Sequence, residues 1–225
     1  PKANEAPLWV ALDDHLGRDT TKQRSGPLLT LNSAGQQSLR LRDGAGTEVA
    51  EARSLRLSWR LAPLAAPVEI ARQIAGPFAS FESAERIARR WRDQGVVARV
   101  AHPGDWEVWA PIDSERLDGV PVRTWLRTLK TEMKIVLEGP SGGRTLQGPL
   151  MLEAPSGLLW QGGVLRGPFR LQPDAYGSWT LLEQVPLERY LEGVVPHEIG
   201  AGSPRAALEA QAVLARTWAL ANSHR

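Results

Sequence analysis

The chain contains no cysteine, and only four of its 27 basic residues are lysine. Without cysteine it can form neither a disulfide nor a thiolate metal site, and cysteine usage gives no indication of the redox compartment. The formal net charge of +2 is too balanced to indicate a nucleic-acid partner. No apolar run approaches the roughly 20 residues of a transmembrane helix, so no membrane span is expected.

The 225 residues are enough for one large domain or two modest ones with a sizeable core. Residues 8–12, 28–31, 39–42 and 55–59 read as short strands, because turn-forming residues separate them. Pro63 and Pro67, with alanines between them, indicate a boundary.

A compact order of elements follows this boundary. Strands are predicted over 69–75, 96–100, 106–110 and 133–138, a helix over 80–94 that ends at Gly95, and a second helix over 122–130. The order is β-α-β-β-α-β. Trp106 and Trp109 lie three apart on one strand and therefore face opposite sides. Only one of them can be core, and the other can stack on a sugar ring or pack partly against Trp91.

Residues 185–222 contain two amphipathic helical patterns on either side of a Pro/Gly-rich elbow. Pro196 is expected to end the first helix, and Ser203-Pro204 to begin the second. Glu198 lies in the elbow, where a carboxyl group fixed between two helices is suited to proton transfer. Alternatively, Glu198 caps the second helix or pairs with an arginine.

Gln211 and Arg216 interrupt the alanine-rich second helix, and polar groups in a packed helix need partners. They lie about 140° apart around an ideal helix. They can therefore share a groove with Glu198 only if that groove wraps the helix edge.

Two runs in this segment carry a family resemblance: V-P-L-E-R-Y-L-E-G-V-V-P-H-E-I-G and S-P-R-A-A-L-E-A-Q-A-V-L-A-R-T-W-A-L-A-N. They resemble the core of the family of stage II sporulation protein D (SpoIID) and the amidase enhancer LytB. The preceding L-L-W-Q-G-G-V-L-R-G-P-F resembles a hairpin of the same family. This resemblance implies lytic transglycosylase-type cleavage of peptidoglycan glycan strands outside the cytoplasm, in the periplasm or cell wall, without a cofactor.

The family's catalytic glutamate falls on Glu198, and its cleft glutamine and arginine fall on Gln211 and Arg216. His197 is a further candidate for substrate binding. The sequence departs from the family pattern at Ile199, Gly200 and Trp218, which are packing changes, and at Glu209, which replaces a lysine. The family domain normally continues past this helix, so the resemblance implies that its C-terminal part is missing here.

One carboxyl group can suffice for this reaction, although ordinary glycosidases use two. The resemblance implies that the sugar's own C6 hydroxyl is the nucleophile, so that one glutamate acts first as acid and then as base. Glu198 must then keep a proton near neutral pH, most simply in an apolar, partly desolvated pocket. Val194, Val195 and Ile199 are expected to form it.

G-P-F-A-S-F-E-S-A-E-R-I-A and Q-G-V-V-A-R-V, in the middle of the chain, resemble SPOR domains. This resemblance implies binding to denuded glycan, and a generic α/β insertion is the alternative. We therefore predict an α+β protein with a helix–elbow–helix catalytic core. Residues 1–62 and 140–225 form the SpoIID-type domain, and residues 63–139 form a SPOR-like insertion with a ferredoxin-like β-α-β-β-α-β order.

Two further interpretations remain open. The chain can be a non-catalytic peptidoglycan-binding protein that enhances a separate cell-wall amidase, or a structural wall protein. His197-Glu198 begins like the zinc pattern H-E-x-x-H, but position 201 is alanine, so no metal site is expected.

Overall fold

The computed structural model describes residues 7–18 and 28–222. These residues form three helices and fourteen strands, which confirms the α+β class. The chain divides into two compact units, one of residues 1–61 and 133–225 and one of residues 62–132. No helix within 7–18 and 28–222 is long and apolar enough to cross a membrane.

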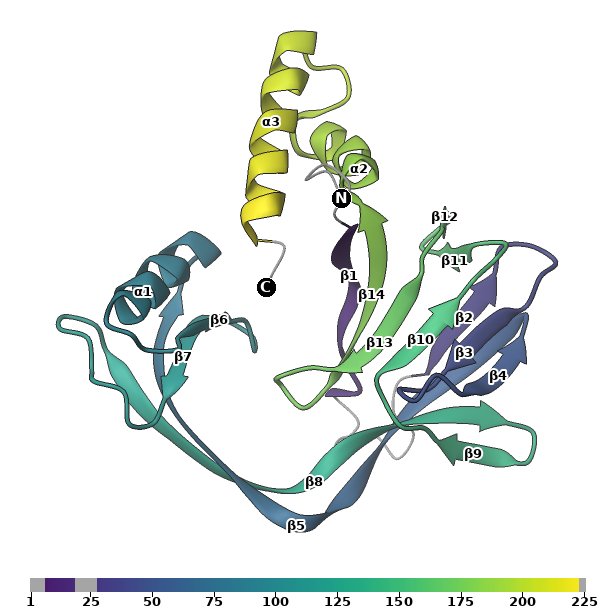
Figure 1. Ribbon diagram of the computed structural model, residues 1–225, viewed down its shortest axis with the longest axis horizontal. Coiled ribbons are helices and arrows are strands. Elements are labelled where there is room, and N and C mark those ends of the chain that lie inside the picture. Colours follow the sequence, from purple (N-terminus) through teal and green to yellow (C-terminus); the bar gives the residue numbers. More distant parts are fainter. Residues whose placement is uncertain (1–6, 19–27, 223–225) are drawn as a thin grey trace. The chain divides into compact units, whose positions relative to one another are not determined.

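The first unit contains an antiparallel sheet of six strands (Figure 1). Their order is β1 (Pro7–Leu16), β14 (Trp179–Pro186), β13 (Phe169–Pro173), β10 (Leu150–Glu153), β3 (Leu39–Arg42) and β4 (Glu48–Ala52). Strand β3 illustrates why this sheet forms. Leu39 and Leu41 of β3 are fully buried, and Arg40 and Arg42 alternate with them. This two-residue period gives the sheet one apolar face and one charged face.

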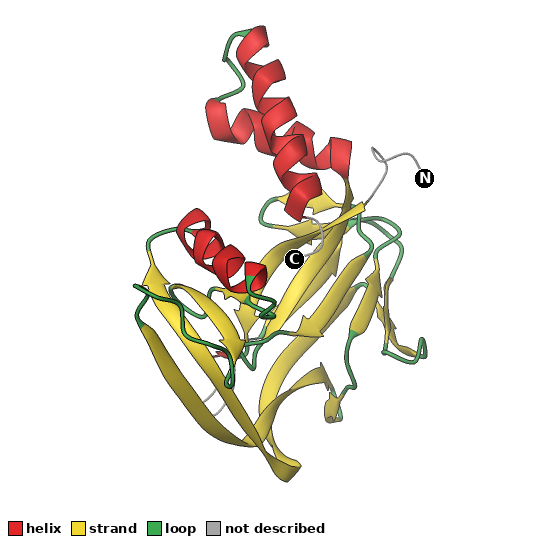
Figure 2. Cartoon of the chain, turned by 60° about the vertical axis from the view of Figure 1, so that its left-hand side comes forward, coloured by secondary structure: helices red, strands yellow, loops and turns green. Residues whose placement is uncertain are grey.

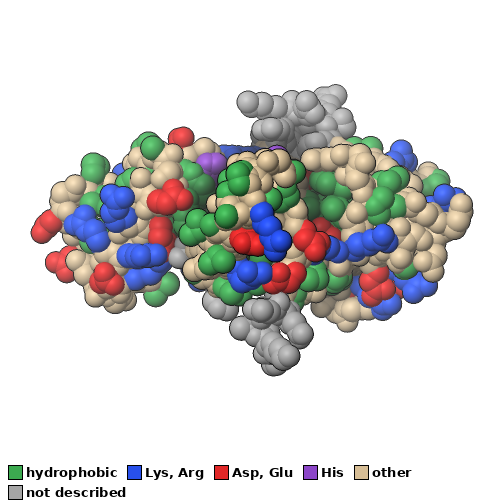
Figure 3. Space-filling model, turned by 90° about the horizontal axis from the view of Figure 1, so that it is seen from above, with side chains coloured by type: hydrophobic (Ala, Val, Ile, Leu, Met, Phe, Trp, Pro, Cys, Tyr) green, Lys and Arg blue, Asp and Glu red, His purple; other side chains and the backbone are tan. Residues whose placement is uncertain are grey.

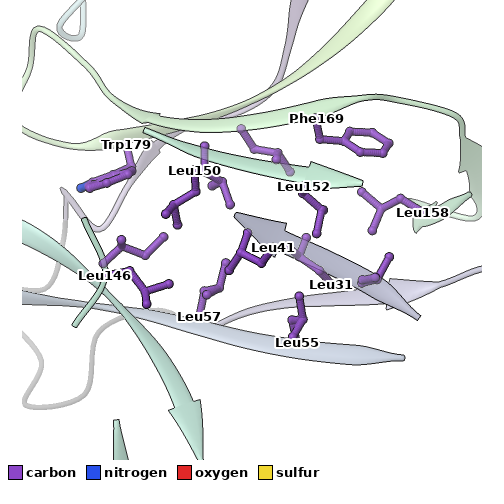
Figure 4. Packing of buried hydrophobic residues seen from close by; sticks show 14 of the residues in the cluster. Leu31, Leu41, Leu55, Leu57, Leu146, Leu150, Leu152, Leu158, Phe169 and Trp179 are labelled. Carbon is purple, nitrogen blue, oxygen red and sulfur yellow. The ribbon is translucent and has the colours of Figure 1, made fainter. Parts of the chain in front are cut away.

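Further strands of the first unit provide the opposite wall of the core. Strands β12 (Gly163–Leu165), β11 (Leu158–Trp160), β2 (Leu29–Ser33) and the start of β5 (Ser54–Phe78) pair in this order. Strand β9 (Gly142–Thr145) pairs with the end of β8 (Val122–Gly139). Leucines from both walls meet between the strands, together with Phe169 and Trp179 (Figure 4). The short strands expected over 8–12, 28–31, 39–42 and 55–59 are confirmed within β1, β2, β3 and β5.

The second unit contains helix α1 (Phe81–Asp93), the end of β5, β7 (Trp106–Pro111), β6 (Arg99–Ala101) and the start of β8. The side chain of Ser80 accepts a hydrogen bond from the Ser83 N–H and so caps α1. Ala84, Ala88 and Trp91 of α1 are fully buried. The helix predicted over 80–94 is therefore confirmed.

The second helix expected over 122–130 is wrong, because these residues belong to strand β8. Val122, Trp125, Leu126 and Leu129 have helical spacing, which explains the expectation. In the strand, however, Leu126 is 70% exposed and takes no part in a buried helical face. Pairing of β8 with β5, and β-branched residues such as Thr124 and Thr128, favour the strand over the apolar period.

Both β5 and β8 run from one unit into the other, so each unit boundary lies inside a strand. Pro63 and Pro67, which indicated a boundary, lie within β5. Residues 133–139, which the sequence assigned to the inserted module, belong to the first unit.

Candidate functional site

Two helices, α2 (Leu187–Ile199) and α3 (Arg205–Asn222), follow β14 and pack against each other (Figures 1 and 2). Their contact has its own small core, formed by Leu8, Leu187, Leu191, Val195, Ala215 and Ala219. The two alanines are the buried residues of α3, and such small side chains allow the helices to approach closely. Leu8 of β1 joins this core, so the helical pair is held at one end of the first sheet.

Pro196 does not end the first helix, contrary to expectation. Helix α2 continues through it to Ile199, and the chain leaves the helix at Gly200, whose φ is +86°. The Gly200 N–H still donates to the Pro196 carbonyl at 3.0 Å. A proline removes one helical hydrogen bond, and the packing of Val195 and the glycine end of the helix outweigh that loss here. Glu198 therefore lies in the last turn of α2 and not in the elbow itself.

Glu198 and Gln211 are brought together by this arrangement. The side-chain amide of Gln211 donates a hydrogen bond to Oε2 of Glu198. Glu198 is exposed and Gln211 is half-buried. Tyr190 lies two turns before Glu198 on α2. Burial raises the pKa of the Tyr190 phenol, and the negative charge of Glu198 raises it further. The phenol is thus kept neutral and remains a hydrogen-bond donor.

Arg216 pairs with a different carboxylate, that of Glu188. Its Nη2 donates to both oxygens of Glu188, at 2.9 Å and 2.7 Å. Gln211 and Arg216 thus lie on opposite sides of the buried stripe of α3, as their angular separation predicts. His197 is exposed in the last turn of α2. The structure joins Glu198 to Gln211 and leaves Arg216 on the other side of the pair.

The apolar shelter expected around Glu198 is absent from the described part of the chain. Val195 points into the helical core, Val194 is half-buried, and Ile199 is 36% exposed. A surface hollow of the first unit lies elsewhere, between β4, β5, β8 and β9, and is lined by Arg56, Glu138 and Arg144 among others. It contains none of the predicted site residues.

A buried carboxylate that sequence reasoning missed anchors α2 to the sheet. Glu183 of β14 is 4% exposed. Its Oε1 accepts hydrogen bonds from the N–H groups of Arg166 and Gly167, at 3.1 Å and 3.0 Å, and from the Arg189 guanidinium of α2. Glu183 occupies an inward position of β14, between Leu181 and Val185. A charge at an apolar position of an alternating strand is the signal that could have found it, since buried charges need partners.

The backbone at Arg166 and Gly167 approaches the Glu183 carboxylate closely because residue 167 is glycine. Its φ is +68°, and a Cβ at this position would lie 2.5 Å from the Phe169 ring. Only glycine meets both requirements without strain. The R-G-P-F run thus has a structural role: it presents two N–H groups to Glu183.

The second unit has an aromatic surface on the sheet face opposite α1. Trp106 packs with the core under α1, whereas Trp109 lies on the other face of β7. The Arg72 guanidinium lies 3.9 Å from the Trp109 ring centre and 4.8 Å from that of Trp125. The Trp109 N–H also donates to Glu107 at 2.8 Å. This agrees with the prediction that the two tryptophans of β7 face opposite sides.

Charged and apolar side chains lie next to each other over the helical pair, as seen from above (Figure 3). On α3, Val213, Leu214 and Trp218 are 60%, 64% and 53% exposed.

Within residues 7–18 and 28–222, no group of three or more His, Asp or Glu side chains is arranged to hold a metal ion.

Residues 175–225 match the family model of SpoIID, stage II sporulation protein. The match contains β14, α2 and α3, with Glu198, Gln211 and Arg216. The SpoIID resemblance drawn from the sequence is thereby confirmed over residues 175–225. Similarity of this segment to the family suggests a role connected with the cell wall. No curated protein and no solved structure gives a significant match.

Proposed function

We propose that this protein cleaves peptidoglycan glycan strands by a lytic transglycosylase-type reaction outside the cytoplasm, with Glu198 as its acid and base. The observation that carries the proposal is the hydrogen bond from Gln211 to the Glu198 carboxylate, within the SpoIID segment. An amide that holds one carboxylate oxygen fixes the side chain and leaves the other oxygen for a substrate.

The reaction requires two proton movements at the same carboxyl group. Glu198 first donates its proton to the glycosidic oxygen as the C1–O bond breaks. Its carboxylate then accepts the proton of the sugar's C6 hydroxyl, as that oxygen bonds to C1 and closes the 1,6-anhydro ring. A saccharide lying over the exposed Glu198 removes water from it, and this favours the protonated form that begins the cycle.

His197 is proposed to bind substrate next to this carboxylate, and Arg216 to bind it on the other side of the helical pair. Both contacts of Arg216 to Glu188 come from Nη2, so Nη1 can donate to a sugar hydroxyl while the pair with Glu188 stays in place. Arg216→Met is then expected to raise KM with little change in kcat. An unaltered KM would remove Arg216 from the substrate-binding set.

Residues 62–132 are proposed to bind the same polymer through Trp109, Arg72 and Trp125. Aromatic faces stack on sugar rings, and the guanidinium between them holds both rings in place. A binding module joined to the catalytic unit raises the local concentration of substrate.

The second candidate function is a non-catalytic wall-binding protein that enhances a separate amidase. The exposed Val213 and Leu214 of α3 favour it, because an apolar helix face is suited to a protein partner. Incubation of the protein with denuded glycan, followed by mass spectrometry, separates the two functions. The enzyme produces 1,6-anhydro ends that Glu198→Gln does not produce. An enhancer produces none and accelerates an added amidase.

A further inference from the structure

Polar and aromatic side chains of both helices lie on one side of the helical pair. On α2, Tyr190, Val194 and Glu198 are spaced four apart and therefore share one helix face. Tyr190 lies close enough to Glu198 for the carboxylate charge to raise its pKa.

The same side of α3 is identified by Gln211, which bonds to Glu198. Trp218 follows Gln211 by seven residues, two helical turns, and therefore lies on the same face. Tyr190, Glu198, Gln211 and Trp218 are called the aromatic strip from here on. The Arg216–Glu188 contact joins the helices two residues before Trp218 and two before Tyr190, and Gln211 joins them at Glu198. Tyr190 and Trp218 therefore lie toward one end of the strip, and Glu198 and Gln211 toward the other.

We propose that Trp218 and Tyr190 form a sugar-binding subsite that positions the glycan for Glu198, an inference that rests on the proposed function. Trp218 is 53% exposed, so a large part of its indole is accessible to a ligand. The face of an aromatic ring is electron-rich and attracts the C–H groups on one side of a pyranose ring. The neutral Tyr190 phenol donates its O–H to a ring hydroxyl or an acetamido oxygen.

The distances along the helices place this subsite away from the reacting bond. Eight residues separate Tyr190 from Glu198, or about 12 Å, and seven separate Gln211 from Trp218, or about 10 Å, at 1.5 Å per helical residue. A saccharide that stacks on Trp218 therefore extends over more than one ring before it reaches Glu198. Trp218 and Tyr190 are positioning residues and do not touch the atoms that react.

The test uses isothermal titration of the 225-residue protein with an N-acetylglucosamine oligomer, together with turnover of denuded glycan. Trp218→Leu keeps an apolar side chain and removes the aromatic face, whereas Trp218→Tyr keeps a ring. We expect Trp218→Leu to raise the Kd roughly tenfold, which corresponds to about 1.4 kcal/mol. We expect Trp218→Tyr to stay close to the original Kd, and Tyr190→Phe to weaken binding without altering the melting temperature.

Val213→Ala is the matched control, since Val213 is 60% exposed on the same helix but on a different face from Gln211. It should leave both Kd and turnover unchanged. In Trp218→Leu, KM should rise with the Kd while kcat changes little.

Two results overturn the inference while the proposed function stands: Trp218→Leu binding the oligomer as tightly as the unaltered protein, or Trp218→Leu and Val213→Ala weakening binding equally. A change in oligomeric state caused by Trp218→Leu, measured by sedimentation, would also overturn it, because the indole would then be a protein-docking residue. If the unaltered protein neither binds nor cleaves glycan, the proposed function itself fails.

Discussion

The buried carboxylate Glu183 provides the sharpest prediction about stability. Its Oε1 is the acceptor for two backbone N–H groups and for Arg189, and its side chain is only 5% exposed. Glu183→Ala leaves the two N–H groups without an acceptor, at about 1–3 kcal/mol each. The Arg189 side chain is 36% exposed and regains water, which moderates its share of the loss. We expect the free energy of unfolding to fall by about 3–5 kcal/mol, the range for a broken buried ion pair.

Glu183→Gln separates the charge from the hydrogen bonds. Its amide oxygen can still accept from the Arg166 and Gly167 N–H groups, but the charged bond to Arg189 is lost. The expected loss is about 1.5–3 kcal/mol, which is the contribution of hydrogen bonds to charged groups. A double-mutant cycle with Arg189→Met should then give a clear coupling energy between the two residues.

Urea unfolding followed by far-ultraviolet circular dichroism measures these changes. Glu192→Gln is the control, because Glu192 is exposed on the same helix and should change stability by no more than about 0.5 kcal/mol. A free energy of unfolding for Glu183→Ala within about 1 kcal/mol of the original value would mean that the buried carboxylate does not stabilise the fold.

Two further predictions concern the first unit. Gly167→Ala places a methyl group against Phe169 at a φ of +68°, so it should lower the melting temperature markedly, and an unchanged value would contradict the close approach. Burial, and secondarily the charge of Asp14, raise the pKa of Asp13 above the ordinary 3.8. The protonated form is then favoured in the folded state, so stability falls as the pH rises from 3.8 through the folded pKa. Asp13→Asn should therefore stabilise the protein at pH 7 and have little effect below that window. Equal melting temperatures of Asp13→Asn and the original protein at both pH values would contradict this prediction.

Secondary structure was predicted correctly where the pattern of neighbouring residues matches a single type of element. Leu39 and Leu41 alternate with arginines, and β3 forms there. Ser80 and Gly95 delimit a helix, and α1 lies between them. In each case the signal is contained in neighbouring residues, so no knowledge of distant contacts is needed.

Expectations failed where distant contacts decide the outcome. The apolar spacing of residues 122–130 favoured a helix, and pairing with β5 makes it a strand. Pro196 favoured a helix end, and contacts of Val195 with α3 help to carry the helix past it. The partners of Glu183 and Arg216 come from other elements, and spacing along one element does not reveal them.

The candidate site was located by resemblance more than by periodicity. Glu198 and Gln211 were named from the family pattern, and the structure places them in hydrogen-bond contact. Angular separation alone indicated that Arg216 lies on another side of α3. The exposure of Glu198 could not be read from the sequence, because Val194, Val195 and Ile199 alternate between core and surface as the helix turns.

The proton transfer that we propose for Glu198 is measured by the release of 1,6-anhydro ends from denuded glycan strands. General acid–base catalysis contributes about 10²–10⁴-fold to rate, so Glu198→Gln should lower the rate of release by at least about a hundredfold. Glu192→Gln, on another face of α2, should release these ends at the original rate. Equal release by the original protein and Glu198→Gln would contradict the account.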